Sequence, residues 1–180
     1  MKTKTVLRLY ALGRWAVYCV IIFTVFCVTT AIHFKVQPIM LIPVAMCIAV
    51  NETGELTAAV TGAVCGLLID FTFGKVFGFS AVLLLFICML TALLFKHWFR
   101  NTAFNIALIC GGFTLIYVCL DFLFYYGIWG YENSLFVFLH YELPACLYTV
   151  IFAVIIHPLF KWIGLRRGSS PPARKKTPKR

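Results

Sequence analysis

The sequence predicts an all-α, polytopic integral membrane protein with six transmembrane helices and both termini in the cytoplasm. Hydrophobic residues make up 62% of the 180 positions and charged residues only 12%, with a mean hydropathy of +0.95. A soluble domain of this length needs far more polar surface. The apolar residues form consecutive blocks of membrane-spanning size, and most basic residues fall on one side of the expected membrane.

A hydrocarbon core of about 30 Å takes roughly 20 helical residues, which sets the expected size of each span. Six blocks approach that length: Trp15–Phe34, Val36–Val50, Thr57–Phe73, Gly78–Phe95, Thr102–Tyr126 and Leu143–Ile163. The second block is short and carries Pro38 and Pro43, so we expect it to be tilted, kinked or sheltered by its neighbours. Tyr131–Glu142 mixes aromatic and polar residues, which is typical of an interfacial segment or a short helix.

The positions of lysine and arginine predict the orientation, because basic loops stay in the cytoplasm. Fourteen of the sixteen lie in the N-terminal arm, the loop after the fourth span and the C-terminal end, and only Lys35 and Lys75 fall on the other side. An even number of spans is needed to keep both basic termini together. Six spans with both termini inside satisfy this requirement, whereas five would place one basic terminus outside.

Three regions follow along the chain: a basic cytoplasmic arm (residues 1–14), the six-helix transmembrane domain (15–165) and a basic tail (166–180). The tail contains three prolines, two serines and seven basic residues, so it cannot build a core and is expected to be disordered. Beside a membrane, such a tail attracts anionic lipid headgroups, with about 1 kcal/mol per charge. We therefore expect no nucleic-acid partner, despite the net charge of +10.

A ladder with a four-residue period runs through the third span and the turn after it, at Ala58, Gly62, Gly66, Asp70, Gly74 and Gly78. Small side chains stacked on one helix face let another backbone approach closely within lipid. We expect this face to pack against another helix, and a partner interface is the alternative. Asp70 is either a structural contact at a helix end or a site of partner or ligand contact, because an acid at membrane depth must face protein or water.

The remaining polar residues indicate no catalytic set. The eight cysteines all fall within expected spans without a CxxC pair, and the four histidines form no metal-binding motif, so we expect no metal and no cofactor. Asp121 is the second acid within a span. We expect it near the outer end of the fifth span, reaching water or a neighbouring hydroxyl, with a functional role as the alternative.

The third span also carries a resemblance to a known family. The run Gly66–Asp70 (GLLID), followed by Gly74 and by Val76–Phe79 (VFGF), resembles the signature of the MreD family of bacterial rod shape-determining membrane proteins. Chain length, span number and a last span that runs through an apolar-Pro-apolar stretch into a basic end agree with that family. One departure is Pro38-Ile39, where the family often has an acid directly after the proline, so a role of that acid is not carried over.

The resemblance implies a non-enzymatic scaffold of the cell-elongation machinery in the bacterial cytoplasmic (inner) membrane. Such a protein would pair with an MreC-like membrane protein and help to couple an MreB-like filament to the peptidoglycan polymerase and transpeptidase. It would thereby maintain a rod-shaped cell.

A second hypothesis is the substrate-binding subunit of an energy-coupling-factor vitamin transporter, whose six-helix fold is similar in size, topology and glycine use. Those subunits meet their coupling partner through an AxxxA face on the first span, and the first span here has no such ladder. A nutrient binder also needs several polar side chains in one outer pocket. The outer segments do offer some polar residues, so this alternative stays open at the level of the sequence.

Overall fold

The computed structural model describes residues 2–31, 39–52, 54–99, 102–127, 136 and 138–165. Within these ranges the protein is all-α, as predicted, with helices α1 (Lys2–Ala31), α2 (Leu41–Asn51), α3 (Glu55–Phe73), α4 (Phe79–His97), α5 (Ala103–Phe122) and α7 (Leu143–Leu165). A π-helical turn at Leu123–Gly127 extends α5, and another at Phe138–Glu142 leads into α7. Pro38, Lys35, most of the expected interfacial segment and the basic tail lie outside the described residues.

Five helical segments of the described chain are long and apolar enough to cross a membrane: Leu12–Ala31, Glu55–Phe73, Phe79–His97, Ala103–Tyr125 and Phe138–Trp162. The prediction of a polytopic all-α membrane protein is therefore confirmed. The element at the second expected span is different, because α2 has only 11 residues. Its length of about 16 Å is roughly half the thickness of the hydrocarbon core.

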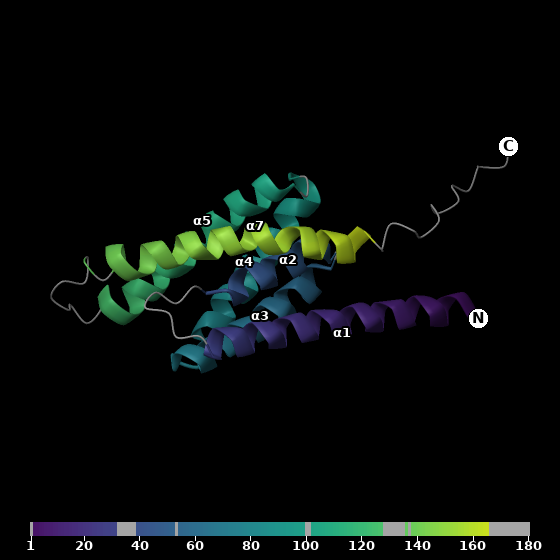
Figure 1. Ribbon diagram of the computed structural model, residues 1–180, viewed down its shortest axis with the longest axis horizontal. Coiled ribbons are helices and arrows are strands. Elements are labelled where there is room, and N and C mark those ends of the chain that lie inside the picture. Colours follow the sequence, from purple (N-terminus) through teal and green to yellow (C-terminus); the bar gives the residue numbers. More distant parts are fainter. Residues whose placement is uncertain are drawn as a thin grey trace.

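Helix α2 lies inside the bundle, with α7 on one side and α3 on the other (Figure 1). Nine of its eleven residues are buried, and it contacts α3, α4, α5 and α7. A helix that is apolar all round is stable only where protein or lipid surrounds it. Pro43 is tolerated in its first turn, since a backbone N–H there has no partner within the helix. The shelter expected from the two prolines is therefore present.

Helix α1 runs along one edge of the bundle and is the least buried of the five long segments, at 22% against 33–44% for the others (Figure 1). Two of its side chains contact other parts of the protein near the start of the apolar run. Arg14 reaches the carboxylate of Glu52 with two nitrogens, Nε at 2.9 Å and Nη2 at 3.2 Å. One turn later Tyr18 is fully buried and stacks on Phe160 of α7, with ring centroids 5.9 Å apart.

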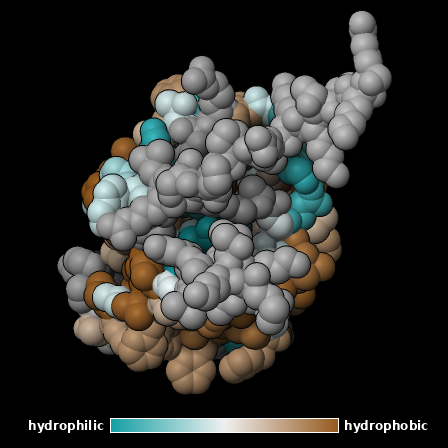
Figure 2. All heavy atoms as spheres, turned by 90° about the vertical axis from the view of Figure 1, so that its right-hand side faces the viewer, coloured by the Kyte–Doolittle hydropathy of each residue, from teal (hydrophilic) through white to brown (hydrophobic). Residues whose placement is uncertain are grey.

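The start of α1 and the end of α7 lie at the same end of the bundle (Figure 1). This arrangement is the one that two cytoplasmic termini require, and the assignment of that end to the cytoplasm stays a prediction. Figure 2 looks onto this end, where hydrophilic patches gather beside hydrophobic surface that continues along the lower rim. The exposed ion pair between Glu55 and Lys96, 2.7 Å apart, joins the start of α3 to the last turn of α4.

Candidate functional site

Two glycines of the sequence ladder, Gly62 and Gly66, lie where α3 packs against α4. A Cβ atom added at Gly62 would lie 2.5 Å from the carbonyl oxygen of Leu84, and one added at Gly66 would lie 2.6 Å from the backbone nitrogen of Ala81. Ala58, one turn before Gly62, is fully buried. Because the opposing atoms are backbone atoms, only glycine permits this approach. The two glycines thus set the distance between α3 and α4 within one chain.

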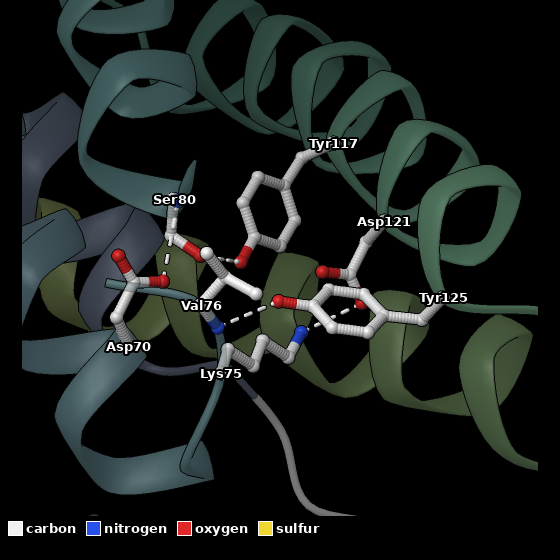
Figure 3. Close-up of polar contacts among 7 residues, drawn as sticks. All are labelled: Asp70, Lys75, Val76, Ser80, Tyr117, Asp121 and Tyr125. Atoms are coloured by element: carbon white, nitrogen blue, oxygen red, sulfur yellow. Dashed lines mark hydrogen bonds and ion pairs between the residues drawn. The ribbon is translucent and has the colours of Figure 1, made fainter. Parts of the chain in front are cut away.

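Asp70 lies at the end of this contact and is fully buried. Its carboxylate accepts hydrogen bonds from the backbone N–H groups of Gly78 at 2.8 Å and Ser80 at 3.2 Å, and Figure 3 shows the bond to Ser80. These groups belong to the start of α4, where N–H groups lack partners within the helix and the helix dipole favours negative charge. Asp70 of α3 therefore caps α4. Its own carbonyl also accepts the N–H of Lys75 at 3.0 Å, which closes the turn.

The last two positions of the ladder, Gly74 and Gly78, have another place in the structure. A Cβ atom at either one would meet nothing within 4 Å. Both have positive φ angles, +60° at Gly74 and +95° at Gly78. Residues other than glycine rarely adopt this backbone conformation. These glycines therefore form the turn between α3 and α4, outside the helix contact.

Lys75, at the tip of that turn, pairs with Asp121 of α5. Its Nζ lies 2.6 Å from a carboxylate oxygen of Asp121, and the two side chains are only 17% and 7% exposed. The rings of Phe73, Tyr117 and Tyr125 surround the ammonium, with centroids 5.5–5.8 Å from Nζ. Aromatic faces and a carboxylate both stabilise a cation that has left water.

This pair departs from the expectation that Asp121 reaches water or a hydroxyl. The sequence places Lys75 and Asp121 at the same end of their spans and with opposite charge, which is a signal that would have suggested the pair. No spacing rule joins two residues 46 positions apart, however. The partner of Asp121 could be identified only once α5 was placed beside the turn.

Helices α3 and α4, with the turn that joins them, form a helical hairpin. Two further hydrogen bonds connect this hairpin to α5 and its π-helical turn (Figure 3). The hydroxyl groups of Ser80 and Tyr117 lie 2.7 Å apart, and the backbone N–H of Val76 donates to the hydroxyl of Tyr125 at 2.8 Å. Elsewhere α4 and α5 make few contacts. We call this set the hairpin clip, formed by Lys75, Val76 and Ser80 on the hairpin with Tyr117, Asp121 and Tyr125 on α5 and its π-helical turn.

The acids of the described chain are largely engaged in holding helices together. Glu52, Glu55 and Asp121 form ion pairs with basic side chains from other elements, and Asp70 caps α4. Within the described ranges no group of three histidine, cysteine, aspartate or glutamate residues could hold a metal ion. The chemistry of these residues is therefore that of structural contacts between helices.

Comparison with known proteins identifies the family of this chain. Neither the curated proteins nor the solved structures contain a match to this chain. The family model described as rod shape-determining protein MreD matches residues 10–163. This range contains the helix contact at Gly62 and Gly66, the cap at Asp70 and the whole hairpin clip. The chain therefore belongs to the MreD family of rod shape-determining proteins.

Proposed function

We propose that this protein acts as a non-enzymatic scaffold of the cell-elongation machinery in the bacterial cytoplasmic membrane. In this role it joins an MreC-like membrane protein and an MreB-like filament to the peptidoglycan polymerase and transpeptidase. The observation that carries the proposal is the match of residues 10–163 to a family of rod shape-determining proteins. The same match favours the scaffold over the substrate-binding subunit of a vitamin transporter.

The use of polar residues supports a scaffold. Four acids form ion pairs or a helix cap, and these contacts join helices at both ends of the bundle. We propose that the ladder in α3 serves internal packing, since α4 covers Gly62 and Gly66, and that partners bind elsewhere. The basic tail, as a further proposal, attracts anionic lipid headgroups.

We propose α1 as the helix that faces the MreC-like partner. It is the least buried long segment, and Val20 and Phe23 on it are 63% and 66% exposed. Exposure alone does not distinguish a partner from lipid, so a matched position is needed. Leu108 of α5 provides one, because its side chain is 58% exposed. A photo-crosslinking residue at Val20 should capture the MreC-like protein, and one at Leu108 should not. Equal capture, or none at Val20, would refute the assignment of α1.

The function itself is tested in a rod-shaped bacterium whose own gene for this protein has been replaced. The wild-type chain, carrying an affinity tag, should restore rod shape and should co-purify the MreC-like protein in mild detergent. Restored shape without that partner would contradict the proposed link. Normal rods that lose uptake of a vitamin when the chain is absent would favour the transporter subunit instead.

A further inference from the structure

The turn between α3 and α4 has an apolar tip. Its outermost side chains, Val76 and Phe77, are 58% and 71% exposed. Turns that face water usually carry glycine, proline, asparagine, aspartate or serine at the tip. This turn has glycine at its two bends, and between them the hydrophobic side chains of Val76 and Phe77 follow Lys75. Its surface is therefore unusual for a loop that projects into water.

The backbone of the turn is satisfied from within the protein. Six of the seven backbone N–H groups from Gly74 to Ser80 donate to an acceptor within the protein. Four of them donate to Asp70: those of Gly74 and Lys75 to its carbonyl, and those of Gly78 and Ser80 to its carboxylate. The N–H of Val76 donates to the hydroxyl of Tyr125, and that of Phe79 to the carbonyl of Val76. Only the N–H of Phe77 is outside this set. Water would satisfy such groups without help, whereas in lipid each unpaired group costs several kcal/mol.

The charge of the turn is also neutralised within the protein. Lys75 is the one charged residue between Gly74 and Phe79, and its ammonium is paired with Asp121 at 2.6 Å. The side chain turns inward, under the rings of Tyr117 and Tyr125. A lysine in a turn that faced water would need neither the carboxylate nor the rings.

The length of the hairpin places the turn at a defined depth. The exposed pair of Glu55 and Lys96 marks the opposite end of the hairpin. Helix α3 has 19 residues from Glu55 to Phe73, which corresponds to about 28 Å. The hydrocarbon core is about 30 Å thick. With the charged pair at one boundary, α3 ends just inside the other boundary, so the tip that follows lies at the depth where the acyl chains of that leaflet meet its headgroups.

We infer that the tip of the α3–α4 turn, Val76 and Phe77, is a lipid-contact site seated in the outer leaflet of the membrane. Asp70 and the hairpin clip make this possible, because they satisfy the polar groups of the turn before it enters lipid. The partner of this surface is thus the acyl chains of the bilayer. The inference is independent of the proposed scaffold function.

The test is a measurement of depth on the purified full-length protein in nanodiscs of the zwitterionic lipid phosphatidylcholine, which does not attract the basic tail as anionic headgroups do. A nitroxide is attached to a cysteine at Phe77, in a background where alanine replaces the exposed Cys19, Cys27 and Cys119. Phe86→Cys, on the exposed face of α4, provides the reference within lipid. Ser170→Cys provides the reference in water, because the composition of the tail predicts that it is disordered. Oxygen partitions into lipid and a nickel chelate into water, so the ratio of their effects on the spin label reports its depth.

We expect the label at position 77 to be relaxed more by oxygen than by the nickel chelate, with a ratio nearer to that of position 86 than to that of position 170. The same result is expected for Val76→Cys, which guards against a local effect of one substitution. A nickel accessibility equal to that of position 170 would overturn the inference. Protection from both reagents would also overturn it, since it would mean that protein covers the tip.

Discussion

The contact at Gly66 allows a prediction whose size follows from the coordinates. In Gly66→Ala the new Cβ would lie 2.6 Å from the backbone nitrogen of Ala81 and from the carbonyl oxygen of Ser80, about 0.8 Å short of the 3.4 Å at which ordinary contacts begin. Both atoms belong to the backbone, so α3 and α4 must move apart. A gap of that size forfeits a quarter to a half of the dispersion energy of the atoms that separate. Overpacking of this kind costs about 1–3 kcal/mol.

Gly112 of α5 is the matched control, because a Cβ atom there would meet nothing within 4 Å. Gly112→Ala should be neutral or more stable by up to about 1 kcal/mol, since alanine is the better helix former. The assay is equilibrium unfolding in mixed detergent micelles, followed by circular dichroism. Gly66→Leu should be worse than Gly66→Ala, while Leu67→Ile, at a position 43% exposed, should change little. Equal stability of the variants at 66 and 112 would refute the argument.

Three further predictions concern the hairpin and the topology. Asp70→Asn keeps one acceptor oxygen and should cost about 0.5–2 kcal/mol, whereas Asp70→Leu leaves two N–H groups unpaired at about 1–3 kcal/mol each; equal accumulation of both variants in membranes would contradict the cap. Lys75→Met leaves Asp121 buried without its cation and should cost about 3–5 kcal/mol, and adding Asp121→Leu should recover most of this loss. A double-mutant cycle measures the coupling, and additive costs would exclude it. Reporter fusions at Arg180 and after Gly127 should report opposite sides of the membrane, with Arg180 inside, and an external Arg180 would contradict the predicted orientation.

The sequence was most informative where a contact depends on residue spacing along one helix. The four-residue period indicates a close approach at Gly62 and Gly66, and the structure has the backbone of α4 at that face. The same regularity includes Gly74 and Gly78, which lie in the turn. The two glycines of the turn continue the four-residue spacing of the helix face by coincidence. The spacing alone therefore could not tell a glycine needed for helix packing from a glycine needed for its backbone conformation.

The sequence was least informative where a contact joins distant elements. Asp121 meets Lys75 because the end of α5 lies beside the α3–α4 turn, and this placement results from packing of both around α2. The tyrosine at position 125 likewise has no local feature that indicates its bond to Val76. For α2 the short block and its prolines indicated a span that is tilted, kinked or sheltered, but the sequence could not choose among these, because the bounds of α2 depend on the helices that cover it.

The burial of α2 has a consequence for the order in which the protein is assembled. A helix of 11 residues leaves part of the hydrocarbon thickness uncovered, so lipid alone is a poor environment for its ends. One of the helices that enclose it, α7, follows all the other described helices in the sequence and is synthesised after them. Until α7 has been synthesised, α2 can contact α1, α3, α4 and α5, but the side that α7 covers stays open. The final position of α2 is therefore reached only after α7 has been synthesised, and chains that stop before α7 should be recognised by membrane quality-control proteases.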